Sequence, residues 1–282
     1  MQSQSDSFAS LPWTDVDLIG FDTETTGKYP LSAEVCELAA VKWRGGRIVD
    51  SFQTLLKPSK PMDAEVIAIH GITNEMVENA PEMNAKIREF HEFIRGGVVV
   101  AHHAPFDLGF MSLEFEKHGL DLPLAPALCS SLLARKLFPE SENHRLQTLI
   151  GFFELERGQA HRALDDARAC LDVTLKCLRK LGDDVLLSEA FSAQGGILQW
   201  QRFSIRELEG MNPRARVLCQ AIREERVIEM NYGAGSTPGD KRRVHPMGLV
   251  RSLDGDYVVA YAEKDQRSKR YLLEKVTAAE IV

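Results

Sequence analysis

Residues 17–27, DLIGFDTETTG, run from the apolar pattern of a buried strand directly into two acids. Side chains two positions apart on a strand project from the same face, so Asp22 and Glu24 should present their carboxylates together. The stretch contains no lysine or arginine, and the first one after it is Lys28. We therefore expect a divalent cation between the acids, and oxygen ligands without cysteine favour Mg²⁺ or Mn²⁺. For the pair alone, a solvated loop at the strand end is the alternative.

The order of strand and helix patterns indicates an α/β domain with a mixed sheet flanked by helices. Three strand patterns within residues 17–56, with the turn signal RGGR between the second and the third, indicate antiparallel neighbours. The apolar run VVVAH lies between helical patterns and adds strand–helix alternation. We assign residues 12–182 to this domain, 183–211 to a linker with short helices, and 212–282 to a small, mostly β domain.

The composition is that of a globular protein and excludes several classes. Of the 282 residues, 44% are hydrophobic and 27% are charged, with no run of 18 apolar residues and no signal-peptide pattern. The formal net charge of -7 combines an acidic first part with a mildly basic part from residue 198 onward, which does not suit a simple binder of polyanions. The five cysteines are scattered without a CxxC pair, which favours free thiols in a reducing compartment. We therefore expect a cytoplasmic protein with no membrane association.

Two later segments supply further acids. In VVVAHHAPFD a buried strand precedes a helix that Pro105 opens, and Asp107 lies in its first turn. An acid that favours the helix dipole is the alternative there. In HRALDDARACLDVTLKCL, Asp165 shares its helix face with charged residues, whereas Asp166 shares its face with small and apolar ones. Asp166 is therefore the ligand candidate, and His161 lies at the helix entrance.

These residues have a joint explanation as a phosphodiester-cleaving site. Two divalent ions about 4 Å apart would neutralise the four acids and stabilise the attacking and leaving oxygens. Histidine titrates near neutral pH, so His161 suits a general base that takes a proton from the attacking water. Asp22 would bridge the two ions.

The motif order FDTETTG, IHGIT, AHHAPFD and HRALDDA resembles that of the DnaQ-like 3'-5' exonucleases of the DEDDh group, over about residues 15–180. The resemblance implies a ribonuclease H-like fold, two Mg²⁺ or Mn²⁺ ions and stepwise release of 5'-nucleoside monophosphates from a 3' end. It also implies that His161 is the base. The implied metal ligands are Asp22, Glu24, Asp107 and Asp166.

Other positions match substrate contacts of the same family. Thr25, Thr26 and Gly27 resemble the loop beside the terminal nucleotide. Glu65 and His70 match positions that contact the same nucleotide, although His70 could instead cap the turn before Gly71. Phe106 matches a stacking or wedge residue, with a core phenylalanine as the alternative.

The chain departs from the family pattern at two places. The family usually has asparagine after the histidine of the Asp107 motif, whereas this chain has His103, to which we assign no role. Many members have Asp-Thr where this chain has Cys129-Ser130. That position lies outside the metal-ligand set and places no ligand in doubt.

Residues 212–282 resemble the WYL domain, a small β-barrel-like module that is implied to bind nucleic acid or a nucleotide-like ligand. The eponymous triplet is replaced by Asp256-Tyr257-Val258, and Leu272 occupies a basic position. Cationic groups are the usual phosphate contacts, although a solvated strand face would have the same pattern. The candidates are Arg242, Arg243, His245, Arg251, Lys269 and Arg270.

The leading hypothesis is a metal-dependent 3'-5' exonuclease that acts on single-stranded DNA or frayed 3' ends. One alternative is an exoribonuclease or oligonucleotidase with the same site, because tolerance of the 2'-OH depends on loop geometry. A second is a non-catalytic nucleic-acid-binding regulator, which should lack one of the five site groups. A third is a proofreading or repair subunit, whose protein partner is unknown.

Overall fold

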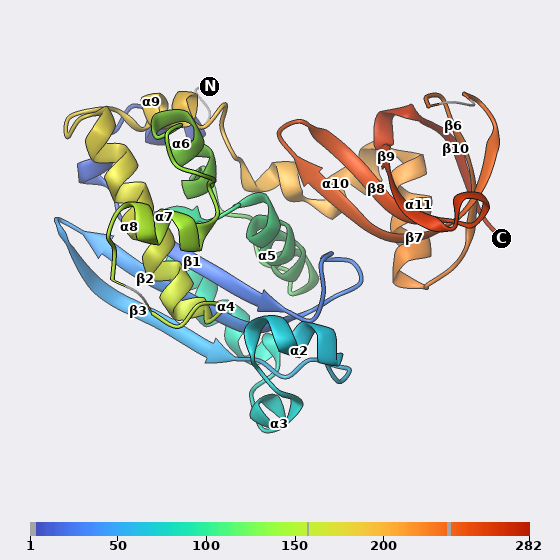
Figure 1. Cartoon of the computed structure of the whole chain (residues 1–282), viewed down its shortest axis with the longest axis horizontal. Coiled ribbons are helices and arrows are strands. Elements are labelled where there is room, and N and C mark those ends of the chain that lie inside the picture. Colours follow the sequence, from blue (N-terminus) through green and yellow to red (C-terminus); the bar gives the residue numbers. More distant parts are fainter. Residues whose placement is uncertain (1–3, 157, 236–237) are drawn as a thin grey trace. The chain divides into compact units, whose positions relative to one another are not determined.

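The computed structural model describes residues 4–156, 158–235 and 238–282 (Figure 1). Their contacts divide the chain into two compact units. The first unit comprises the chain up to Thr26 and Val35–Trp200, and the second comprises Gly27–Glu34 and Gln201–Val282. Each unit has its own sheet.

The sheet of the first unit contains five strands within the described residues, in the order β3-β2-β1-β4-β5. Strand β1 pairs antiparallel with β2 and parallel with β4, so the sheet is mixed, as the sequence predicts. The three antiparallel strands predicted within residues 17–56 are β1, β2 and β3. The bounds are β1 Leu18–Thr25, β2 Val35–Arg44, β3 Arg47–Leu55, β4 Val98–Ala101 and β5 Leu128–Cys129.

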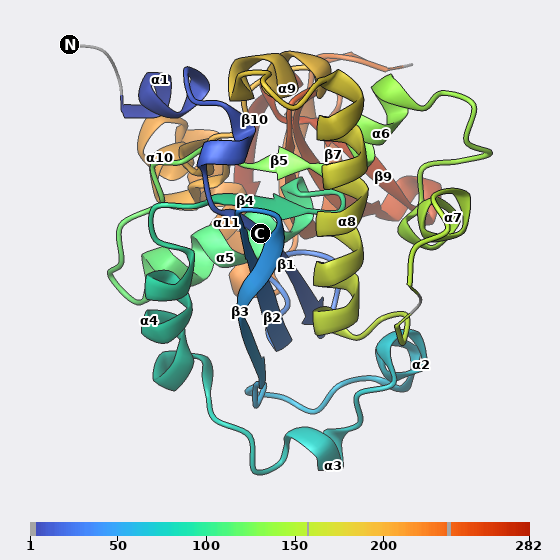
Figure 2. The ribbon, with the colours of Figure 1, turned by 90° about the vertical axis from the view of Figure 1, so that its left-hand side faces the viewer.

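Helices cover both faces of this sheet (Figure 2). The long helix α8 packs on β1 and β2, while an aromatic cluster that includes Phe21, Phe90 and Phe115 joins β1 to α4 and α5 on the other face. Burial of these rings supplies much of the hydrophobic stabilisation. The helices are α1 Gln4–Ala9, α2 Ala64–His70, α3 Asn74–Val77, α4 Met83–Ile94, α5 Pro105–Lys117, α6 Ser130–Leu137, α7 Leu146–Phe152, α8 Ala163–Leu181 and α9 Leu187–Ala193, with the 3-10 turn Trp13–Asp15.

Gly20 sets the separation between β1 and α8. A Cβ atom at this position would lie 2.4 Å from the backbone oxygen of Ala167 and 2.8 Å from Cβ of Leu171. Only glycine therefore permits the helix to approach the strand this closely. Since Asp22 lies two residues after Gly20 and Asp166 precedes Ala167, the same contact brings two of the predicted acids together.

The second unit contains a sheet whose order, over the described residues, is β10-β6-β7-β8-β9, with antiparallel pairing throughout. Helix α11 begins with Pro213 as its first residue, and the side chain of Asn212 accepts from the backbone N–H groups of Arg214 and Ala215. The elements are α10 Ile205–Met211, α11 Pro213–Arg223, β6 Ile228–Tyr232, β7 Lys241–Ser252, β8 Gly255–Ala262, β9 Arg267–Leu272 and β10 Val276–Ile281, with 3-10 turns at Trp200–Phe203, Glu263–Asp265 and Leu273–Lys275.

The segment 183–211, for which we expect a linker with short helices, contains α9 and α10. Its first part packs into the first unit, because Leu187, Ala190 and Phe191 are buried in that unit's core. The contact division falls between Trp200 and Gln201, later than the boundary at residue 182 that we expect from the sequence. The apolar spacing within VLLSEAFSA accounts for this packing.

Two further observations bear on the class of protein. Within residues 4–156, 158–235 and 238–282, no helix is long and apolar enough to cross a membrane. All five cysteines of the sequence lie in the described part of the chain, where each is buried and free.

Candidate active site

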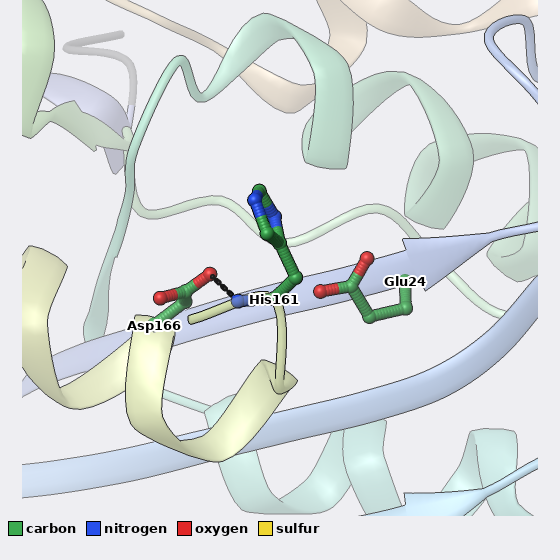
Figure 3. Close-up of side chains that lie close together, drawn as sticks. All are labelled: Glu24, His161 and Asp166. Atoms are coloured by element: carbon green, nitrogen blue, oxygen red, sulfur yellow. Dashed lines mark hydrogen bonds between the residues drawn. The ribbon is translucent and has the colours of Figure 1, made fainter. Parts of the chain in front are cut away.

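Three elements place the predicted acids at one end of the first unit's sheet. Asp22 and Glu24 lie near the end of β1, and Asp107 and Asp166 lie in the first turns of α5 and α8. Glu24, His161 and Asp166 each offer a ligand atom, and these atoms all lie within 4.8 Å of one another (Figure 3). The strand and the helix thus hold two carboxylates on either side of the His161 loop.

The two acids of β1 share an environment that opposes their ionisation. Burial raises the pKa of Asp22 well above its ordinary value, and the negative charges of Asp107, Glu24 and Asp166 raise it further. Burial, followed by the charges of Asp166 and Glu37, raises the pKa of Glu24 to about 8. Carboxylates this close favour a bound cation, which would relieve both effects.

Asp107 is held in place by the strand itself. Its Oδ1 atom accepts hydrogen bonds from the backbone N–H of Thr23 at 3.1 Å and from the Thr23 hydroxyl at 2.8 Å. Burial raises the pKa of Asp107 to about 7, although these hydrogen bonds oppose the rise. The side chain is 2% exposed, so α5 delivers a carboxylate into the interior at the position where β1 carries its own acids.

Asp166 connects the start of α8 to the loop that carries His161. Its Oδ2 atom accepts from the backbone N–H of His161 at 3.1 Å. His161 has a φ of 59°, in the left-handed region, and its side chain is exposed. Burial raises the pKa of Asp166, and the hydrogen bond from His161 opposes the rise.

Asp165 has a role that the sequence does not predict. The charged face of α8 suggests that it is a bystander, yet its Oδ2 atom accepts from the backbone N–H of Gln159 at 2.8 Å. The two adjacent acids therefore hold different parts of one loop. Asp166 remains the one whose carboxylate lies beside Glu24.

Glu37 is a fifth carboxylate at this site, and the sequence reasoning missed it. It lies on β2 directly opposite Glu24 and is 0% exposed. Its oxygens accept from Nη2 of Arg162 at 2.9 Å, from Nε of Arg162 at 3.2 Å, from the backbone N–H of Ala163 at 3.1 Å and from Nε2 of Gln53 at 3.0 Å. Burial opposes its ionisation, but these hydrogen bonds outweigh burial and lower the pKa of Glu37.

The donor set fits a hard divalent cation. Glu24 and Asp166 offer carboxylate oxygens, Asp22 and Asp107 add negative charge nearby, and the ring of His161 lies within 4.8 Å of the first two. Burial, together with the charges of Asp22, Asp107 and Asp166, raises the pKa of the Cys170 thiol well above its ordinary value, which keeps it protonated. A site built from oxygen donors, with a protonated thiol, suits Mg²⁺ or Mn²⁺ better than a thiophilic metal.

The predicted substrate contacts fall in different environments. Thr25 is buried and Thr26 and Gly27 are partly exposed, whereas Glu65 is exposed in the first turn of α2. Phe106 is partly exposed, and its ring lies 5.0 Å from that of Phe110.

His70 is engaged within the fold. It is 4% exposed, its Nδ1 accepts from the backbone N–H of Ile72 at 3.0 Å, and its Nε2 lies 3.8 Å from Sγ of Cys36. Burial lowers the pKa of His70, which favours the neutral ring. This arrangement matches the turn-capping alternative.

Backbone geometry explains the departure from the family pattern at His103. This residue has a φ of 62°, and asparagine, aspartate and histidine are the non-glycine residues that most often adopt such values. Its neighbour His102 is held by the hydroxyl of Ser130 at 2.8 Å and by the backbone oxygen of His144 at 3.1 Å. Burial lowers the pKa of His102 to about 4, which favours a neutral ring within these contacts.

Three of the predicted cations of the second unit line one cavity of about 520 Å³: Arg242, Arg243 and Lys269. The Arg242 guanidinium lies over the ring of Tyr271, 5.9 Å from its centre. The hydroxyl of Tyr271 is buried and has no hydrogen-bond partner in the described part of the chain. The cavity also contains Lys241, Lys264, Asp240, Glu263 and Asp265.

The remaining cations lie elsewhere in the second unit. Arg251 is 9% exposed and pairs with Asp256 at 3.4 Å, which makes it part of the fold. His245 pairs with Glu263 at 2.9 Å, and Arg270 is exposed on β9. The acids around these groups neutralise part of the positive charge that the sequence predicts.

Comparison with known proteins identifies both parts of the chain. Residues 19–174 match the family model described as exonuclease, and residues 213–281 match the WYL domain model. Two PolC-type DNA polymerase III chains are similar, one from Halalkalibacterium halodurans with 40% identity over 161 residues and one from Bacillus subtilis with 41% over 161 residues. These matches cover 57% and 56% of this chain and 11% of each relative, so the chain spans about a ninth of their length.

Solved structures share the fold at low identity. A zinc-bound complex of E. coli ExoI with single-stranded DNA has 17% identity and a TM-score of 0.54, and it covers 87% of this chain and 54% of that one. The nuclease domain of 3'hExo, a DEDDh family member bound to rAMP, has 15% identity and a TM-score of 0.52, and it covers 60% and 95% of the two chains. The ribonuclease H-like fold is thereby confirmed. Because the exonuclease model covers more than half of the chain, the protein belongs to that exonuclease family and carries a WYL domain after its exonuclease domain.

Proposed function

We propose that the protein is a metal-dependent 3'-5' exonuclease that releases 5'-nucleoside monophosphates. The observation that carries the proposal is the meeting of Asp22, Glu24, Asp107 and Asp166 around one space, with His161 exposed beside it. All five side chains that the DEDDh resemblance names are present, which a purely binding regulator would not need. Each raised carboxylate pKa is consistent with a site that takes up positive charge.

The chemistry follows from the positions of the side chains. When bound, two Mg²⁺ or Mn²⁺ ions would supply the positive charge that stabilises the attacking and leaving oxygens. Asp22, Glu24, Asp107 and Asp166 would hold them. His161 would take a proton from the attacking water at a ring nitrogen, and its exposed position leaves that ring accessible.

We favour single-stranded DNA as the substrate. The PolC-type relatives are DNA polymerases, and one structural neighbour is a complex with single-stranded DNA. RNA is the alternative, because another neighbour is bound to rAMP. Thr25, Thr26 and Gly27 would lie beside the terminal nucleotide, with Glu65 and Phe106 as further contacts.

The test uses 5'-labelled single-stranded DNA, duplex DNA and RNA of one sequence, incubated with Mg²⁺ or with a chelator. A ladder that shortens from the 3' end only in Mg²⁺ is expected, and the fastest of the three substrates identifies the preference. Internal cleavage or activity in the chelator would contradict the proposal. Asp166→Asn should abolish the ladder, and Asp172→Asn, which removes an acid from another face of the same helix, should leave it intact.

His161→Ala separates proton transfer from metal binding. We expect the rate at saturating substrate to fall by roughly 10²–10⁴-fold, the usual contribution of a general base. Binding of Mn²⁺, followed by calorimetry, should persist. An unchanged rate would remove the proposed role of His161.

We further propose that the cavity lined by Arg242, Arg243 and Lys269 binds phosphate groups of nucleic acid. Arg243→Ala should weaken binding of single-stranded DNA in chelator and flatten its salt dependence by about one unit of log–log slope. Fluorescence anisotropy measures both quantities. Arg216→Ala, on the exposed surface of α11, is the matched control, and equal behaviour of the two variants would argue against the cavity.

The free, buried cysteines support our further proposal of a cytoplasmic protein.

A further inference from the structure

Glu37 differs from the other carboxylates of the site because its hydrogen bonds lower its pKa, whereas burial raises theirs. Within the described part of the chain it accepts four hydrogen bonds, and two of them form a fork with the guanidinium of Arg162. A forked pair of this kind fixes direction as well as distance. Glu37 therefore has its positive partner built into the fold.

The position of this pair in the chain gives it a specific effect. Arg162 is the residue before α8, where no side chain of its own caps the helix, and Ala163 is the first helical residue. Glu37 accepts from the backbone N–H of Ala163 at 3.1 Å, so a residue of β2 performs the capping. The start of α8 is thereby joined to the sheet beside Glu24.

His161 is the residue before Arg162, whose guanidinium forms the forked pair with Glu37. On one side, its own N–H donates to Asp166 at 3.1 Å. On the other, Arg162 and Ala163 are held by Glu37. An exposed side chain on a loop with a left-handed φ depends on such anchors for a fixed position.

We propose that Glu37, acting through Arg162, is a positioning residue that holds His161 over Glu24 and Asp166. This inference rests on the proposed exonuclease function. It predicts that disrupting the fork displaces the histidine while the carboxylate site stays formed.

The kinetic test compares Glu37→Gln with Gln53→Leu. Glu37→Gln places an amide NH₂ against the donors of Arg162, whereas Gln53→Leu removes one hydrogen bond to Glu37 and leaves the fork untouched. We expect Glu37→Gln to lower the maximal rate at least about tenfold with less than about a threefold change in the Michaelis constant. In a His161→Ala background, the same change should cost less than about twofold, because the group through which it acts is gone. Equal losses in both backgrounds would overturn the proposal.

Amide hydrogen exchange supplies a readout that needs no activity. In Glu37→Gln and in Arg162→Lys, which keeps the charge but not the fork, exchange at the His161 amide should rise at least about tenfold. The backbone amides that pair β1 with β2 should exchange as in the unmodified chain. Gln53→Leu should change exchange neither at the His161 amide nor at these paired amides. If Glu37→Gln does not fold, the exchange measured in Arg162→Lys tests the proposal, because the Arg162 side chain is 26% exposed and its replacement is tolerated more easily. Unchanged exchange at the His161 amide would overturn the proposal. This readout does not depend on activity, so it also separates a failure of the positioning role from a failure of the exonuclease function.

Discussion

Glu24 and Glu37 lie opposite each other on neighbouring antiparallel strands and are both buried, with exposures of 9% and 0%. Their ionisation nevertheless differs in direction. The pKa of Glu24 is raised to about 8, whereas the pKa of Glu37 is lowered. Burial is common to both, so their partners account for the difference.

The comparison separates two uses of a buried acid. Glu37 is surrounded by donors from Arg162, Ala163 and Gln53, and the pair is complete within the chain. Glu24 faces other carboxylates, and the charge of Arg162 offsets their effect on its pKa only in part, so a cation from solution would balance the remainder. Two acids on adjacent strands thus differ in use: Glu37 holds the chain in place, and Glu24 attracts a cation.

The largest effect expected from this comparison is on Glu24. Glu24→Gln should reduce nucleotide release about a thousandfold, as for loss of a group that stabilises developing charge. In chelator the same variant should be at least as stable as the unmodified chain, since it removes a buried acid whose ionisation the site opposes. Initial rates and urea unfolding measure the two effects. A variant that loses both activity and stability would show that Glu24 is part of the framework.

Glu37→Ala should have the opposite pattern of stability. It leaves the Arg162 guanidinium without its partner and removes the cap of α8, so we expect a loss of about 3 kcal/mol in the free energy of unfolding, with or without metal. Urea unfolding in chelator provides the number. A loss below about 1 kcal/mol would mean that solvent replaces Glu37 readily.

The pH dependence of the metal effect sharpens the contrast further. The folded pKa of Glu24 is raised from 4.5 to about 8, so between these values the unfolded metal-free chain releases a proton that the folded chain retains, and stability falls as pH rises. Mg²⁺ or Mn²⁺ should oppose that loss. We expect the metal-induced increase in Tm to be larger at pH 8 than at pH 5 by roughly 5 °C, measured by calorimetry. Equal increases at both pH values would contradict the raised pKa.

The smallest effect belongs to Gln53→Leu. Gln53 is exposed and contributes one of the hydrogen bonds to Glu37, so its removal should cost less than about 1 kcal/mol. Thermal unfolding suffices for the measurement. A larger loss would assign to Gln53 part of the role that we give to Arg162.

Local patterns predicted some of the side chains that the fold brings together at the candidate site. The i, i+2 relation on β1 and the choice of Asp166 over Asp165 on α8 predicted side chains that the fold brings together. The same reasoning missed Glu37, although an acid inside the apolar run EVCELAAV also needs a partner. That partner, Arg162, is 125 positions away in the sequence, and only the strand register and the packing of α8 bring the two together.

Other differences have the same physical origin. The backbone role of His103 depends on a positive φ, which no periodicity reports. Arg251 carries a charge that suits phosphate, yet its side chain is 9% exposed and lies against Asp256 on the neighbouring strand, which also pairs with Arg202. Contacts between residues on neighbouring strands are therefore the part of such a site that is hardest to predict from a single sequence.

The contact at Gly20 has a consequence for how this site tolerates change. The atom nearest to a side chain at this position is the main-chain oxygen of Ala167, and no substitution on α8 can remove a main-chain atom. A methyl group at position 20 would lift the start of the helix and Asp166 with it, and a shift of about 1 Å in a reacting group lowers rates roughly 10²-fold. The absence of a side chain at Gly20 is therefore a requirement for keeping Asp166 at its present distance from β1, and we expect substitutions at this position to be poorly tolerated.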